Sequence, residues 1–219
     1  ELEGKVKIRY CYNILDDQKI FQKARYIPSL DCLVRPLLVS VGRIHPQKGY
    51  IRLVNILGDL KKEGLSFSLW IIGDGPERNK VQKKIDDLGL SKWITLVGSN
   101  DNPYSYVTRA DLFVCSSFWE GYSTACTEAA ILGIPILTTA VSGGQEIIQD
   151  AECGMIVDLD DNSLKNGLRT VLSSPKLLQE WRATAERTKK KFWLENRKKD
   201  MNQLFDRFIQ DADEKGNNQ

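Results

Sequence analysis

Short apolar runs alternate with longer segments of helical periodicity along most of this chain, and that alternation restricts the fold more than any other feature. Six runs of three to six residues are too short for helices, and they lie at 37–41, 67–72, 93–97, 112–115, 134–137 and 155–157. Between them, helical spacing of apolar residues recurs at 51–63, 77–88, 124–132 and 163–172, with Gly64, Gly89 and Gly133 placed to end three of these segments. Strand and helix in repeated alternation predict an α/β fold, a Rossmann-like doubly wound parallel sheet of about six strands.

Length and composition are those of an ordinary globular protein. The 219 residues are about one and a half times the ~150-residue norm for a domain, which indicates one large domain or a domain with an appendage. With 42% hydrophobic and 27% charged residues, the chain lies outside the disordered and collagen-like classes. Lys plus Arg (31) against Asp plus Glu (29) leaves a net charge of +2, so we expect no nucleic-acid partner.

The cysteines and the single histidine bear on location and on metal binding. The five cysteines are odd in number and widely spaced, and Cys115 lies inside an apolar run, which favours reduced core thiols of a cytosolic protein. Because His45 is the only histidine, a zinc site is disfavoured. No apolar stretch approaches the ~20 residues needed to cross a bilayer. We therefore expect a cytoplasmic protein, with at most peripheral contact with the inner face of the plasma membrane.

Three further patterns have competing interpretations. The Asp-Leu-Asp triplet at 158–160 could hold a metal, but it precedes a helix for which one of residues 161–163 would serve as the cap. His45 could be proposed as a general base. The basic clusters at 189–191 and 197–199 could contact anionic lipid, although charge runs on a polar helix usually form a solvated face.

Two loops that follow apolar runs have the residues expected of a ligand site. Ligands of parallel α/β sheets bind outside the carboxyl ends of the strands. The loop from Gly42 to Gly49 has glycines at both ends, and its Arg43 and Lys48 could bracket one anionic group such as a diphosphate. Considered alone, the same two cations could be solvated surface. The loop at 73–78, which begins with Gly73, is interpreted as a tight turn that could line a pocket, because Arg78 replaces the third glycine of a dinucleotide fingerprint.

The segment from Ser116 to Ala129 is the most informative. Glu120 lies just before a helix start, Ser123 or Thr124 can supply the cap, and Glu128 lies about one turn into the helix. Exposed amides at a helix N-terminus suit phosphate oxygens, and carboxylates accept hydrogen bonds from the vicinal hydroxyls of a ribose or a hexose. The competing interpretation makes Glu120 a helix-dipole residue and Glu128 a solvated one.

Taken together, these residues resemble the donor-binding half of the GT-B-fold retaining glycosyltransferases of family 4, the glycosyl transferases group 1, which include sucrose synthases and many bacterial surface-polysaccharide transferases. Gly42-Arg43 followed by Lys48-Gly49 is similar to the Gly-Arg-x4-Lys-Gly loop of that family, and Glu120 to Glu128 is similar to its Glu-x7-Glu motif. The pattern continues in order through 129–135 and 143–146, so the resemblance covers about residues 37–175.

The resemblance implies roles for individual residues. Arg43 and Lys48 would neutralise the departing nucleotide diphosphate in place of a divalent metal, and Glu120 would contact the transferred sugar. Glu128 would hold the ribose hydroxyls. Backbone of Gly121, Tyr122, Ser123 and Thr124 would cradle the phosphates and sugar, while Gly42, Gly73 and Val97 would line the nucleotide site, with the loop after Val97 bordering the base. Ser123 departs from the family pattern, which commonly has a glycine at that position.

The resemblance also implies a division of the chain. Residues 1–36 would be an interdomain linker and the end of a missing N-terminal acceptor domain, and residues 37–175 the nucleotide-sugar-binding domain. Residues 176–210 would form C-terminal helices that cross back to the absent half, and residues 211–219 a disordered tail.

The implied enzyme transfers a hexose-type sugar from a UDP- or GDP-linked donor, with retention of configuration and without a metal cofactor. The acceptor would be lipid-linked or a saccharide, and the pathway cell-surface polysaccharide biosynthesis, with this chain inactive alone. The alternatives are a nucleotide-sugar epimerase or phosphorylase of the same architecture and a non-catalytic nucleotide-sugar-binding module.

Overall fold

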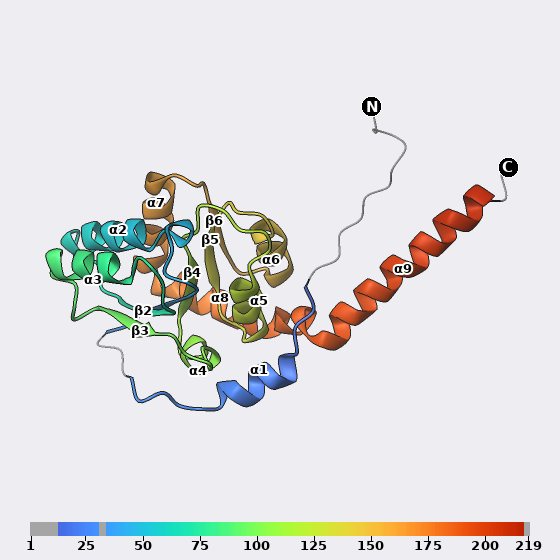
Figure 1. The fold of residues 1–219 in the computed structure, drawn as a ribbon, viewed down its shortest axis with the longest axis horizontal. Coiled ribbons are helices and arrows are strands. Elements are labelled where there is room, and N and C mark those ends of the chain that lie inside the picture. The colour runs from blue at the N-terminus through green and yellow to red at the C-terminus, as the bar shows by residue number, and fades with distance from the viewer. Residues whose placement is uncertain (1–12, 31–33, 217–219) are drawn as a thin grey trace.

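The computed structural model describes residues 13–30 and 34–216, with side chains described as far as residue 209. Its centre is a six-stranded, all-parallel sheet in the order β3-β2-β1-β4-β5-β6 (Figure 1). The strands are β1 (Leu37–Val41), β2 (Ser68–Ile72), β3 (Ile94–Gly98), β4 (Leu112–Cys115), β5 (Ile136–Thr139) and β6 (Gly154–Val157). Each lies within about two residues of an apolar run in the sequence, so the doubly wound α/β prediction is confirmed.

The strands are apolar without alternation because both faces of the sheet are covered. Leu38, Leu69 and Val114 point into one core cluster, whereas their neighbours Val39 and Trp70 point into the other. Helices α2 (Tyr50–Lys62), α3 (Arg78–Asp87) and α7 (Asp161–Leu172) build the first cluster. The second contains α4 (Tyr104–Val107), α5 (Thr124–Ile131), α6 (Gly144–Ala151) and α8 (Pro175–Thr188).

Glycines end three helices as the sequence predicts. Gly64, Gly89 and Gly133 each follow the C-cap residue of α2, α3 and α5, and their φ angles of 91°, 68° and 71° lie in the left-handed region. A residue with a Cβ adopts this conformation only at a cost, so glycine there stops the helix and frees the chain to enter the next strand.

A helix occupies part of the segment expected to be an irregular linker. Asp16 caps α1 (Asp17–Ala24) by accepting a hydrogen bond from the amide of Lys19 at 3.0 Å, and Ile20 is buried in the second core cluster. Helix α1 packs against α4, where Lys23 Nζ donates to the carbonyl of Asp101 at 3.1 Å. Residues 5–10, whose alternating apolar and polar side chains predict a strand, lie outside the described residues.

The C-terminal helices are present as expected, and the last one is longer than expected. After α8, the 3-10 turn η2 (Lys189–Phe192) leads into α9 (Leu194–Gly216), which extends away from the sheet (Figure 1). The tail was expected to begin at residue 211, but no glycine or proline interrupts the segment before Gly216, and the helix continues to that point. Within the described part of the chain, no helix is both long and apolar enough to cross a membrane.

The strand order sets the position of the ligand-binding edge. The chain moves outward from β1 through β2 to β3, returns to the centre at β4, and then moves the other way through β5 to β6. The loops that leave the carboxyl ends of β1 and β4 therefore diverge at a topological switch point, where open α/β sheets bind their ligands.

Candidate functional site

The loop after β1 is shaped by close packing of backbone against backbone. A Cβ on Gly73 would lie 2.0 Å from the carbonyl oxygen of Gly42, so the ends of β1 and β2 approach each other only with glycine there. The 3-10 turn η1 (Pro46–Lys48) follows, and His45 caps it through Nδ1, which accepts a hydrogen bond from the amide of Gln47 at 3.4 Å. The turn places Lys48 at the edge of the sheet, and His45 has a structural role in this loop.

Three hydrogen bonds tie this loop to the loop after β4. The amide of Phe118 donates to the carbonyl of Gln47 at 2.8 Å, and Gln47 Nε2 donates to the carbonyl of Trp119 at 2.8 Å. Ser116 Oγ donates to the carbonyl of Lys48, also at 2.8 Å. The two divergent loops therefore form one connected surface at the switch point.

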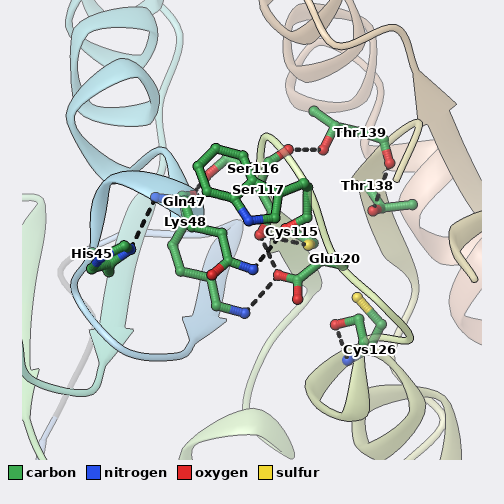
Figure 2. Close-up of polar contacts among 12 residues, drawn as sticks. His45, Gln47, Lys48, Cys115, Ser116, Ser117, Glu120, Cys126, Thr138 and Thr139 are labelled. Atoms are coloured by element: carbon green, nitrogen blue, oxygen red, sulfur yellow. Dashed lines mark hydrogen bonds and ion pairs between the residues drawn. The ribbon is translucent and has the colours of Figure 1, made fainter. Parts of the chain in front are cut away.

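An ion pair joins the two loops at the side-chain level (Figure 2). Lys48 Nζ lies 2.6 Å from Glu120 Oε1, and Ser117 Oγ donates to the same oxygen at 2.5 Å. Only 20% of the Lys48 side chain and 10% of the Glu120 side chain are exposed, so water screens the pair weakly. An anionic group that binds Lys48 here has to displace the Glu120 carboxylate.

The N-terminus of α5 lies just beyond Glu120. Ser123 is the cap residue, and its Oγ accepts a hydrogen bond from the amide of Cys126 at 3.3 Å, as the sequence predicts. Gly121 and Thr124 are exposed, and nothing lies within 4 Å of a Cβ built on Gly121. The start of α5 next to Glu120 is therefore exposed, and an exposed helix N-terminus suits an anion.

Glu128 reaches the same edge from inside α5, where it meets a tyrosine from another loop. Tyr104, the first residue of α4, donates from its hydroxyl to Glu128 Oε1 at 2.9 Å. Burial raises the pKa of the Glu128 carboxyl, and the Tyr104 hydrogen bond opposes that rise. Burial, together with the Glu128 charge, raises the pKa of Tyr104 to about 12, so the phenol keeps its proton and acts as the donor.

Comparison with known proteins assigns the family. Residues 33–188 match the family described as glycosyl transferases group 1. The chain belongs to this family. It is 30% identical over 188 residues to the N-acetylgalactosamine-N,N'-diacetylbacillosaminyl-diphospho-undecaprenol 4-alpha-N-acetylgalactosaminyltransferase of Campylobacter jejuni, covering 85% of this chain and 50% of that protein. It is also 32% identical over 126 residues to the lipopolysaccharide core biosynthesis glycosyltransferase LpsE of Rhizobium meliloti, covering 58% of this chain and 36% of LpsE.

Solved structures show the same fold. The lipopolysaccharide outer core galactosyltransferase WaaB superposes with a TM-score of 0.73 at 20% identity, covering 94% of this chain and 58% of WaaB. Anabaena HepE, solved in complex with UDP, superposes with a TM-score of 0.70 at 16% identity, covering 90% of this chain and 56% of HepE. The chain therefore spans about half the length of these two proteins, and it shares with them the Rossmann-like α/β fold seen in GT-B structures.

The structure brings some of the residues of the group 1 motifs together and leaves others apart. Lys48 and Glu120 are in contact, and the backbone of 121–124 lies next to them. Arg43 is exposed and forms no hydrogen bond or ion pair with the described residues. Val97 lies half-buried near the end of β3, and Glu128 is bound to Tyr104 rather than to the Lys48–Glu120 pair.

Arg52 is a site residue that the motif reasoning missed. Its guanidinium is 5% exposed and donates to the carbonyl of Ser116 from Nε at 3.0 Å and from Nη2 at 2.6 Å, and to the carbonyl of Leu159 from Nη1 at 2.5 Å. It also lies 3.9 Å above the ring of Phe118. Arg52 therefore holds the start of the loop that carries Glu120. The available signal was a lone arginine among apolar residues at 51–54 of a helical segment.

The described residues contain no group of three or more His, Cys, Asp or Glu side chains placed to hold a metal ion. Asp160 is the helix cap of α7 and accepts from the amide of Ser163 at 2.9 Å, one residue before the caps expected from the sequence. Cys115, Cys126 and Cys153 are buried free thiols. Cys11 and Cys32 lie outside the described residues.

A cavity lies at the opposite edge of the sheet, where the amino ends of the strands are. Its volume is about 900 Å³, and Arg35, Arg109 and Arg182 are among its lining residues, next to the amino ends of β1 and β4. Arg35 is paired there with Asp111 at 2.8 Å, and Arg182 donates to the carbonyl of Ala110 at 3.2 Å. This cavity contains none of the group 1 motif residues, and the carboxyl edge remains the candidate site because ligands of such sheets bind there.

Proposed function

We propose that this chain is the donor-binding half of a retaining, metal-independent hexosyltransferase, and that the switch point between β1 and β4 binds a nucleotide-diphosphate sugar. The observation that supports this most is the Lys48–Glu120 contact beside the exposed start of α5, in a chain of the glycosyl transferases group 1 family. It places a largely buried cation and a carboxylate able to accept from hydroxyls next to the start of a helix.

In this proposal, positive charge stabilises the leaving group. When the bond between the anomeric carbon and the phosphate oxygen breaks, the nucleotide diphosphate leaves with the bonding electrons and charge builds on its oxygens. Lys48 and the exposed Arg43 neutralise that charge, and the α5 amides donate hydrogen bonds to it. Removing one preorganised donor of this kind typically costs about 2.7–4 kcal/mol in the transition state.

Glu120 and Glu128 have different tasks in the proposed complex. Glu120 gives up Lys48 to the diphosphate and accepts hydrogen bonds from hydroxyls of the transferred sugar. Glu128 accepts from the ribose, Val97 lines the nucleotide site, and the loop after β3 borders the base, which we expect to be uracil or guanine. HepE binds UDP, and its fold resembles this one, which supports a nucleotide ligand for this edge.

The acceptor follows from the relatives rather than from this half of the fold. The relative from Campylobacter is named for a diphospho-undecaprenol acceptor and the one from Rhizobium for lipopolysaccharide core. We therefore propose a lipid-linked or saccharide acceptor in cell-surface polysaccharide biosynthesis, bound by a second domain not contained in these 219 residues. A cytoplasmic site of action at the inner face of the plasma membrane is consistent with such an acceptor.

A transfer assay tests the proposal. The longest natural polypeptide containing this chain is incubated with isotope-labelled UDP- and GDP-sugars and a lipid-linked acceptor, and the anomeric configuration of the product is read by NMR. We expect transfer with retention, and a loss of about 10²–10³-fold in kcat for Arg43→Ala and for Lys48→Ala. Lys92→Ala, a change at an exposed lysine before β3, is the matched control and retains activity.

Three results would contradict the proposal. Near-normal turnover by Lys48→Ala would remove the assigned role of the cation. Isomerised donor formed without an acceptor would favour the epimerase alternative. Tight donor binding without turnover in any acceptor mixture would favour the non-catalytic module.

A further inference from the structure

Tyr104 and Glu128 form an isolated polar contact at the carboxyl edge of the sheet. The tyrosine comes from the loop after β3 and the glutamate from α5, so two separate elements meet there. The hydroxyl of Tyr104 donates to Oε1 of Glu128 at 2.9 Å. The described residues donate no hydrogen bond to the other oxygen, Oε2, so the carboxylate has unused acceptor capacity.

The position of the Tyr104 hydroxyl is fixed by the loop beneath it. Ser105, which is 1% exposed, donates from its hydroxyl to the carbonyl of Asn102 at 2.9 Å. Asn102 in turn donates from Nδ2 to the carbonyl of Lys23 on α1 at 2.9 Å, and its amide donates to Asn100 Oδ1 at 2.8 Å. The Tyr104 ring packs on the second core cluster. The loop that carries Tyr104 and the apolar part of its ring are therefore both held in place.

We propose that Tyr104 is a positioning residue that fixes the Glu128 carboxylate for the hydroxyls of a ribose and so makes the site select ribonucleotides over 2'-deoxyribonucleotides. The inference rests on the proposed function, since it requires a nucleotide at this edge. One oxygen of the carboxylate is oriented by Tyr104, and the other is left to accept from the 2'-hydroxyl. Without the tyrosine hydroxyl, the glutamate side chain is free to rotate about its terminal bonds and loses its orientation toward the sugar.

The test compares two ligands on three proteins. Calorimetric titration gives the Kd of UDP and of 2'-deoxy-UDP, and of GDP and 2'-deoxy-GDP if guanine is the base, for the unmodified chain, Tyr104→Phe and Tyr106→Phe. Tyr106 is a matched control on the same helix, because its ring packs against Trp70 and its hydroxyl accepts only a long 3.5 Å hydrogen bond from Asn100. Thermal unfolding shows whether each variant is folded.

We expect the unmodified chain and Tyr106→Phe to prefer the ribonucleotide by about tenfold or more, the value of a hydrogen bond to a charged group. Tyr104→Phe should bind the ribonucleotide about fivefold more weakly while binding the deoxyribonucleotide as before, so that the preference largely disappears. If Tyr104 had only a structural role, Tyr104→Phe would weaken the binding of both nucleotides equally, and the ratio of their Kd values would not change.

Each alternative outcome excludes a different statement. If Tyr104→Phe keeps the preference of the unmodified chain, or binds the ribonucleotide more tightly, the positioning role is wrong while the nucleotide site stands. If the unmodified chain binds the ribonucleotide and the deoxyribonucleotide with the same Kd, the proposed contact between Glu128 and the ribose is wrong, and the inference fails with it. If it binds no nucleoside diphosphate at all, the proposed function fails first.

Discussion

Lys48 and Glu120 neutralise one another in the absence of a ligand, and this pairing has a direct consequence for binding. Both side chains are largely buried, and an unpaired charge in such a place would be costly. A diphosphate that binds Lys48 must take the place of Glu120, which is then available to a sugar hydroxyl. Phosphate binding and sugar binding are thereby linked through a single exchange of partners.

The exchange predicts opposite effects of Glu120→Gln on binding and on transfer. Removing the competing charge leaves Lys48 to the phosphates, so UDP without a sugar should bind as tightly as before or about two- to fivefold more tightly. Sugar transfer should fall by about 100-fold because the hydroxyl contact is weakened. Calorimetry gives the first quantity and steady-state kinetics the second. Weaker UDP binding by Glu120→Gln would show that Glu120 does not compete for Lys48.

Glu128 predicts a pH dependence of nucleotide binding. The ionised carboxylate accepts from the ribose, and burial raises its pKa. Affinity is therefore complete above that raised pKa and is lost as the pH falls through it, at a higher pH than for an exposed glutamate of pKa about 4.3. Titrations from about pH 4, below the range of an exposed glutamate, to about pH 8 test this. Glu128→Gln is the control, since that variant keeps the phosphate titration of the ligand. Parallel profiles for the two proteins would contradict the assignment.

Among single residues, the sequence predicts the charged site residues better than the residues that hydrogen-bond to them. Lys48 and Glu120 are recognisable from motif spacing, and the cap at Ser123 from the residue type before a helix. Ser117 and Tyr104 have no such signal, because their importance depends on which loops the sheet order brings together. A serine after a strand and a tyrosine in a polar loop are otherwise unremarkable residue types.

Among the elements, α2 does more than cover the sheet. Its Arg52 reaches across to the carbonyls of Ser116 and Leu159, which belong to loops after β4 and β6. One side chain of α2 thereby joins the loops after two strands, β4 and β6. Asp161 compensates the charge from 3.6 Å, while burial lowers the pKa of the guanidinium.

Arg52→Met should destabilise the chain by about 2–4 kcal/mol, because several buried carbonyls lose their donors together. It should also weaken donor binding, since the loop that carries Glu120 loses its support. Urea unfolding measures the first effect, and Lys62→Met is the control, at a residue of the same helix whose side chain is 72% exposed. If Arg52→Met unfolds at the urea concentration of the unmodified chain, the contacts of this arginine contribute nothing to stability.

Helices and strands are predicted correctly where the periodicity of apolar residues is strong. They are missed where tertiary contacts determine whether the element forms. The six strands and the glycine-stopped helices follow from local sequence, since apolar runs and left-handed caps are local signals. The sequence does not predict helix α1, because Ile20 is its only buried apolar residue and the helix is held by tertiary contacts with α4 and with the start of α9. The N-cap of α7 lies one residue before the predicted positions, because any of the four polar residues at 160–163 could cap a helix.

At the scale of the whole molecule, α9 is anchored at its base and exposed further along. The base of α9 is fixed by Arg197, which lies 2.8 Å from Asp150 on α6, and by the amide of Leu194, which donates to Asp17 at 2.9 Å. Further along, Phe205 and Ile209 are 56% and 60% exposed. In a polypeptide of the length of the relatives, we expect these side chains to be covered by the second domain.

The central claim is that a nucleoside diphosphate binds at the carboxyl edge between β1 and β4, and a crystal structure of the chain with UDP or GDP tests it most directly. The account predicts phosphate oxygens within hydrogen-bond distance of Lys48 Nζ and the first-turn amides of α5, with Glu120 released from the lysine. A nucleotide bound instead in the cavity beside Arg35 and Arg182, with the Lys48–Glu120 pair intact, would contradict it.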